Sequence, residues 1–191
     1  MSSLENMLIL HCAPTLLGIK QANLFSCPIE DSEELLNEIN TYNNLLNLKD
    51  IYFKVLYTCK SRIFILVYRK TKMFSYITHR KVAYFLKSEG YNIPKVIDDI
   101  DNTLNFLGKR ITGCEEFPHE IGFFLGYPKE DVFEYIKNSG RNYKFCGYWK
   151  VYGDEKKAKK TFWQYRKCKE VMENKRNSGT SVLNLLGVSN I

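Results

Sequence analysis

Hydrophobic positions along the chain recur with two periods, and each period predicts one kind of secondary structure. Between residues 32 and 48, apolar side chains return every three or four positions after an acidic start, which predicts an amphipathic helix. Residues 51–57 alternate instead, and residues 62–69 form a nearly continuous apolar run. A short polar turn separates these two segments. We therefore expect a β-hairpin whose second strand is central and buried on both faces.

The middle of the chain has a helical period in two stretches. A helix is expected over about 72–89, ending at Gly90. The apolar stripe over 93–107 predicts a second helix, with Pro94 in its first turn and Gly108 at its end.

Proline, glycine and aromatic residues divide the rest of the sequence. Pro118 and Pro128 each suit the start of a short helix. Residues 145–152 are aromatic and β-like, and Asp154 is placed to cap a long amphipathic helix after them. We expect residues 176–191 to form a loosely attached tail.

Length and composition agree with an ordinary globular protein. The chain has 191 residues, of which 45% are hydrophobic and 26% charged. Its longest apolar run, residues 63–68, is far too short to cross a membrane, and its first residues do not resemble a signal peptide. We therefore expect a cytoplasmic protein with no membrane partner. The elements together predict a single α+β domain over 1–191, with a three- to four-stranded, mainly antiparallel sheet covered by helices.

The cysteines and histidines give no sign of a metal site. Six cysteines occur without a Cys-x-x-Cys pair or a spacing typical of zinc ligands, so we expect reduced thiols and no bound metal. Cys27 and Pro28 are expected to close a strand; a Cys-Pro pair can also be a haem-regulatory thiolate. No cofactor is indicated by any longer motif. The oligomeric state cannot be read from the sequence.

Charge is distributed in blocks of opposite sign. Residues 49–88 hold ten basic residues and one acidic residue, and residues 140–191 hold twelve and four. If these two basic blocks formed one continuous face, the protein could bind nucleic acid. A lysine-rich helix face is more often a solvated surface, and blocks of opposite sign can also pair with each other.

The first candidate for chemistry is a cysteine-dependent hydrolase or acyl/thiol transferase. If Pro14 begins a helical turn, Cys12 lies at a helix N-terminus, where the helix dipole lowers the pKa of a thiol. In this hypothesis Cys12 is the nucleophile, His119 its base and Glu120 the group that orients the base. The alternative is that Cys12 is a small buried hydrophobic residue.

The second candidate is a non-catalytic module that binds a small anion or a cofactor, such as a nucleotide or haem. Lys20 and Lys150 both lie within apolar or aromatic segments, where a buried ammonium needs an acid or an anion. Tyr148 and His11 complete this candidate set. If Lys150 faces inward, Glu120 is a candidate protein partner for it, and exposed aromatic residues beside lysines could also stack on bases.

Long strings of residues resemble an uncharacterised bacterial family, the domain of unknown function three-seven-nine-three. The strings are HCAPTL from His11 with Gly18, Lys20 and Ala22–Phe25, then FPHEIG from Phe117, FLGYP from Phe124, Asp131–Val132 and GYWKVY from Gly147. The resemblance covers roughly residues 5 to 175, with departures at Gln21 and Phe133. It implies one full-length domain of a cytoplasmic bacterial protein and assigns no activity. The strings contain the candidate residues Cys12, His119, Glu120, Tyr148 and Lys150.

Overall fold

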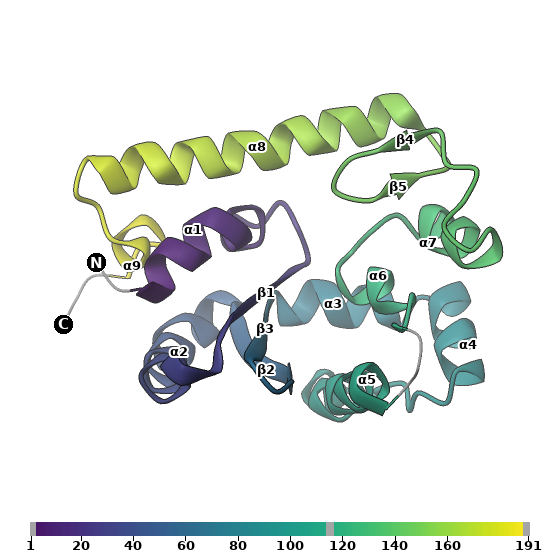
Figure 1. Cartoon of the computed structure of the whole chain (residues 1–191), viewed down its shortest axis with the longest axis horizontal. Coiled ribbons are helices and arrows are strands. Elements are labelled where there is room, and N and C mark those ends of the chain that lie inside the picture. Colours follow the sequence, from purple (N-terminus) through teal and green to yellow (C-terminus); the bar gives the residue numbers. More distant parts are fainter. Residues whose placement is uncertain (1–2, 114–116, 189–191) are drawn as a thin grey trace. The chain divides into compact units, whose positions relative to one another are not determined.

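The computed structural model describes residues 3–113 and 117–188 (Figure 1). Their contacts group the chain into two compact units: unit 1 is formed by residues 1–69 and 164–191, and unit 2 by residues 70–163. Unit 2 is thus inserted into the sequence of unit 1, and helix α8 (Glu155–Asn177) contributes residues to both. The predicted α+β class is confirmed, while the single domain stays a prediction.

Unit 1 contains a three-stranded antiparallel sheet. Strands β1 (Ala22–Pro28) and β2 (Tyr52–Thr58) flank β3 (Arg62–Tyr68), and both pair with it antiparallel. The predicted hairpin and its central second strand are therefore confirmed. The end of β1 at Pro28 also agrees with the expected strand end.

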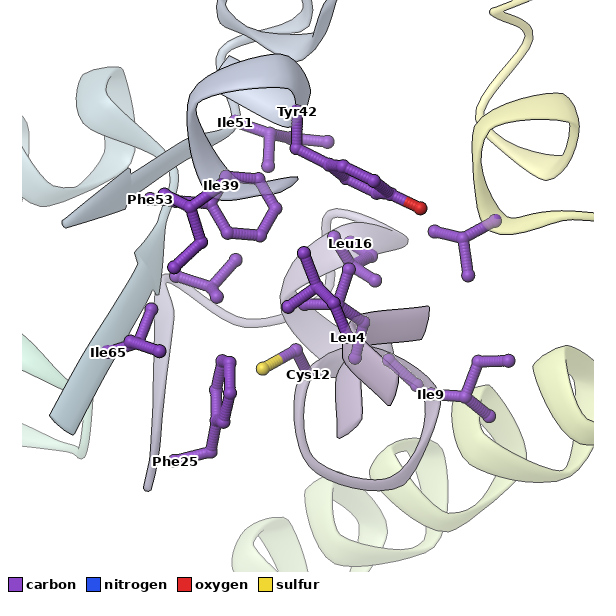
Figure 2. Close-up of a cluster of buried hydrophobic side chains, with 14 of the residues drawn as sticks. Leu4, Ile9, Cys12, Leu16, Phe25, Ile39, Tyr42, Ile51, Phe53 and Ile65 are labelled. Atoms are coloured by element: carbon purple, nitrogen blue, oxygen red, sulfur yellow. The ribbon is translucent and has the colours of Figure 1, made fainter. Parts of the chain in front are cut away.

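Two helices cover one face of this sheet. Helix α1 (Ser3–Leu16) and helix α2 (Ser32–Leu46) bury their apolar side chains against β1, β2 and β3 in one cluster (Figure 2). Helix α2 confirms the helix expected over 32–48. Short 3-10 turns precede and follow it at Ile29–Asp31 and Asn47–Lys49.

The C-terminal segment is packed into unit 1. Helix α9 (Val182–Leu185) follows α8, and Val182 is completely buried. The backbone N–H of Val182 donates to the buried Glu5 carboxylate at 2.9 Å, and the Tyr42 hydroxyl donates to the same oxygen at 3.1 Å. The expectation of a loose tail over 176–191 is wrong for its described part, because a buried carboxylate needs these donors and holds the segment in place.

Unit 2 is mostly helical. Its elements in chain order are α3 (Lys70–Ile77), α4 (Arg80–Ser88), a 3-10 turn (Ile97–Asp99), α5 (Ile100–Gly113), α6 (Ile121–Phe124), α7 (Lys129–Lys137), β4 (Phe145–Cys146), β5 (Lys150–Val151) and the start of α8. Strands β4 and β5 form a short antiparallel hairpin, where a single β-like segment was expected. Among the described residues, no helix is long and apolar enough to span a membrane.

Two helix boundaries in unit 2 differ from the expectation. The helix expected over 72–89 is interrupted after Ile77, where the Thr78 hydroxyl donates to the Phe74 carbonyl at 2.6 Å and His79 leaves helical geometry. The next helix begins only at Ile100, so Pro94 lies before it, and Gly108 is buried inside it. Acidic residues beside the 3-10 turn, and not the proline, mark this helix start.

Candidate functional site

A pocket of about 400 Å³ opens in unit 2 between α6, α7 and the β4–β5 hairpin. Its volume lies in the range of small-molecule sites. Aromatic and aliphatic side chains form most of its wall, with a few polar groups among them. The lining residues are Phe117, His119, Ile121, Gly122, Leu125, Tyr127, Asp131, Val132, Tyr135, Cys146, Gly147, Tyr148, Trp149 and Lys150.

The wall is held together by contacts between aromatic rings. Tyr127 stacks on Trp149 with the ring centroids 5.2 Å apart. Trp149 also makes a perpendicular contact with Phe162, with the ring centroids 4.4 Å apart. Tyr148 also packs on Phe162, at 5.4 Å. A Cβ on Gly147 would lie 2.2 Å from the Phe162 ring, so only glycine allows the hairpin to approach α8 this closely.

Asp131 fixes the hairpin onto α7. This buried carboxylate accepts hydrogen bonds from the Trp149 indole N–H at 2.7 Å and from the backbone N–H groups of Tyr152 and Gly153 at 2.9 and 2.8 Å. Because its carboxylate oxygens already accept three hydrogen bonds, Asp131 orients Trp149 and is not an acid available to a ligand in the pocket.

Lys150 lies at the edge of the pocket with an unexpected partner. Its ammonium donates to the Gly140 carbonyl at 2.8 Å and lies over the rings of Tyr143 and Tyr135, 4.9 and 5.6 Å from their centroids. No ion pair joins Lys150 to any carboxylate in the described part of the chain. The candidate pairing with Glu120 is therefore not formed, since Glu120 pairs with Arg110. Because an ammonium has three donors and one carbonyl uses only one, Lys150 retains capacity for an anion.

Glu120 instead belongs to a partly buried ion pair, in which its own carboxylate is buried and Arg110 is 24% exposed. The Arg110 guanidinium lies 2.6 Å from its carboxylate and also pairs with Glu89 at 2.9 Å. The Tyr91 hydroxyl donates to Glu120 at 3.0 Å, and burial beside this carboxylate raises the pKa of Tyr91. These contacts give Glu120 a structural role, because they satisfy its buried carboxylate without any ligand. His119 is exposed and packs on the edge of Tyr135, with the ring centroids 5.0 Å apart.

Cys12 occupies a position opposite to the one expected. It lies near the end of α1, with Pro14 inside the last turn of that helix, so Pro14 does not begin a helix and the positive end of the dipole is distant. The thiol is completely buried, and Figure 2 shows its sulfur directed toward Phe25 and the sheet. Burial raises the pKa of the Cys12 thiol well above its ordinary value, where the sequence predicted a lowered pKa.

Lys20 and His11 also lie in unit 1. Lys20 is buried, 5.8 Å from the centroid of the Tyr165 ring, and burial lowers its pKa to about 8. His11 is exposed on α1 and stacks on Phe25 at 6.3 Å. Burial and the charge of Lys169 lower the pKa of His11.

The structure thus divides the candidate residues by unit. His119, Tyr148 and Lys150 line one pocket in unit 2, whereas Cys12, Lys20 and His11 belong to unit 1. Only three of the lining residues were assigned a role from the sequence, and Tyr127, Tyr135 and Asp131 are among those that were missed. Asp131 and Tyr127 do occur in the strings that carry the family resemblance, which was the one available signal.

The exposure of the thiols gives a direct prediction. Cys59 and Cys146 are exposed, and backbone hydrogen bonds from the turn lower the pKa of Cys59. In the native protein we expect iodoacetamide to modify these two first and Cys12 only on unfolding, as followed by peptide mass spectrometry. Fast modification of Cys12 that slows in the His119→Ala variant would instead support the nucleophile hypothesis. Cys114 lies outside the described residues.

Comparison with known proteins identifies a family but no activity. The family model described as a protein of unknown function (DUF3793) matches residues 8–186, nearly the whole chain and both units. No curated protein and no solved structure matches the chain. Since the match covers nearly the whole chain, including the strings that line the pocket, the chain belongs to the DUF3793 family.

Proposed function

We propose that this protein is a binding module whose pocket in unit 2 takes a small anion carrying a planar aromatic ring. The observation that carries the proposal is the lining itself: an aromatic wall around Trp149 with the Lys150 ammonium at its edge. Rings of this kind bind a planar ligand by stacking, and an ammonium that keeps unused donors binds an anionic group.

The polar groups favour an anion over a cation. Asp131 already accepts three hydrogen bonds, and Glu120 pairs with Arg110 outside this pocket. Lys150 is therefore the charged group of the pocket lining that still has donors for a ligand. His119, which also lines the pocket, can supply a further N–H donor. Nucleotides combine a planar ring with an anionic group, and a pocket of about 400 Å³ is large enough for one.

The cysteine-dependent reaction has less support. A nucleophile must reach its substrate as a thiolate, but Cys12 has no exposed surface and burial raises the pKa of its thiol. We therefore assign the pocket a binding role without a reaction.

The test compares a charged ligand with its neutral counterpart. In the Trp163→Phe variant, which leaves Trp149 as the one tryptophan, adenosine monophosphate is titrated while Trp149 fluorescence is followed. We expect it to bind about tenfold more tightly than adenosine, a difference of about 1.4 kcal/mol. Lys150→Met should abolish that difference and leave adenosine binding unchanged.

A lysine outside the pocket provides the control. Lys157 is exposed on α8 and does not line the pocket, so Lys157→Met should preserve the preference for the charged ligand. If adenosine monophosphate, the other nucleoside monophosphates, flavin mononucleotide and haem all leave Trp149 fluorescence unchanged at millimolar concentration, the proposed function is wrong.

A further inference from the structure

Most of the exposed aromatic side chains described in unit 2 gather around the pocket and the first half of α8. Phe117, Tyr143, Tyr148 and Trp163 are all more than two-fifths exposed; Tyr84 on α4 is exposed further still, at 79%, and does not line the pocket. Burying such rings is favourable, so a cluster of exposed ones marks a surface that binds a partner.

Basic residues alternate with these rings. Residues 140–163 contain seven basic and two acidic residues. Lys150 lies over Tyr143 at the pocket edge, and Lys159 lies over Phe145 of the hairpin at 4.8 Å. The hairpin and α8 are joined by Phe162, which packs on Tyr148. Cations and aromatic rings are therefore interleaved from the pocket to the first turns of α8.

The first turns of α8 extend this pattern along one helix face. Lys156, Lys160 and Trp163 are spaced four and three residues apart, which places them on the same side of the helix. All three are exposed, and no ion pair is described for either lysine. We call the surface formed by these three residues and Tyr148 the stacking track.

We infer that unit 2 binds single-stranded nucleic acid, with one base in the pocket, neighbouring bases on Tyr148 and Trp163, and phosphates on Lys156 and Lys160. The inference rests on the proposed function, since it makes the planar anion of the pocket one nucleotide of a longer chain. Aromatic platforms beside a basic surface are how proteins hold unpaired bases without reading their sequence.

Two other polyanionic surfaces fit the track less well. Duplex nucleic acid hides the faces of its bases, so neither the pocket nor Tyr148 could stack on them. A lipid surface requires a continuous apolar face, whereas lysines separate the rings here.

The experiment measures anisotropy of a short fluorescent single-stranded oligonucleotide of mixed sequence against the full-length protein, over a range of salt concentrations. We expect affinity to fall with salt with a log–log slope of about −2, as for some three phosphate contacts. Lys156→Glu/Lys160→Glu should weaken binding by more than about tenfold and flatten that slope. Tyr148→Ala should weaken binding by about tenfold through lost stacking and leave the slope unchanged.

A charge-matched variant controls for net charge. Lys81 and Lys87 are exposed on α4 in the same unit, so Lys81→Glu/Lys87→Glu changes the charge equally without touching the stacking track. We expect it to bind like the unsubstituted protein. Equal losses in both double variants, or equal binding of the corresponding duplex, would overturn the inference.

The failure of the inference is distinguishable from the failure of the proposed function. If adenosine monophosphate binds but the oligonucleotide binds no more tightly, the pocket takes a free small molecule and the track is wrong. If phosphatidylserine vesicles bind through Lys156 and Lys160 while the oligonucleotide does not, the surface is a lipid site. If neither mononucleotide nor oligonucleotide binds, both proposals fail.

Discussion

The Asp131→Ala variant is expected to lose about 4 kcal/mol of unfolding free energy, because two buried donors and one partly buried donor lose their charged acceptor. These donors are the Trp149 indole and the backbone N–H groups of Tyr152 and Gly153. Urea unfolding followed by Trp149 fluorescence in the Trp163→Phe background measures this loss. The same variant should lose the pocket, since Trp149 would no longer be held against Tyr127.

A surface aspartate of unit 2 supplies the comparison. Asp98 pairs with Lys70 at 2.7 Å, but its side chain is 84% exposed. Exposed ion pairs contribute little to the free energy of unfolding, so Asp98→Ala should lower it by less than about 1 kcal/mol. A similarly small cost for Asp131→Ala would show that the hairpin is held mainly by its ring contacts.

The Lys20→Met variant is expected to be more stable than the unsubstituted protein at neutral pH. Burial lowers the pKa of Lys20 to about 8 from 10.5, so the folded state disfavours the charged ammonium by about 3 kcal/mol. Methionine keeps the length of the side chain and removes that cost. We expect a gain of about 2 kcal/mol in urea unfolding at about pH 7.

The stability gain of Lys20→Met should also depend on pH, and the direction of that dependence can be predicted. Between the folded pKa and the ordinary one, the unfolded chain binds a proton at Lys20 that the folded chain does not. Lys20 therefore makes stability rise with pH in this window. The advantage of Lys20→Met should shrink by about 2 kcal/mol between about pH 7 and about pH 9.5. Taking the difference between the two proteins cancels most of the opposing effect of Cys12, whose raised pKa lowers stability at alkaline pH.

Lys60→Met is the matched control for this prediction. Lys60 is exposed in the turn between β2 and β3, so its replacement should change stability little at either pH. An advantage of Lys20→Met that stayed constant with pH would mean that Lys20 is not a buried ammonium in the folded protein.

The sequence predicted the elements that have one clearly apolar face. Helix α2 and the β2–β3 hairpin follow from local periodicity, because the apolar residues of each element recur with a single period and face the same hydrophobic core. Helix α1 was not predicted, because its exposed side also carries apolar residues, such as Leu10 opposite the buried Leu4 and Cys12, and so no polar face reveals its period. Pro14 then suggested a helix start, although it lies in the last helical turn.

The candidate site could be predicted only in part. Tyr148, Lys150 and His119 were selected from their unusual residue context, and they do line one pocket. The hypothesis that His119 is the base for Cys12 could not be judged from the sequence. Local periodicity predicts helices and strands, but it does not show which distant segments come into contact. The same holds for Asp131, whose function depends on Trp149, eighteen residues later, and on the burial of both.

The insertion of unit 2 has a consequence for the order in which the protein forms during synthesis. Unit 2 is one continuous stretch, so its contacts can form as soon as Trp163 has left the ribosome. Unit 1 requires partners from the two stretches on either side of unit 2: Glu5 is translated before unit 2, but its donor Val182 is translated after it. The nascent chain therefore carries an incomplete unit 1, with Glu5 still without this donor, until translation has passed unit 2 and reached Val182.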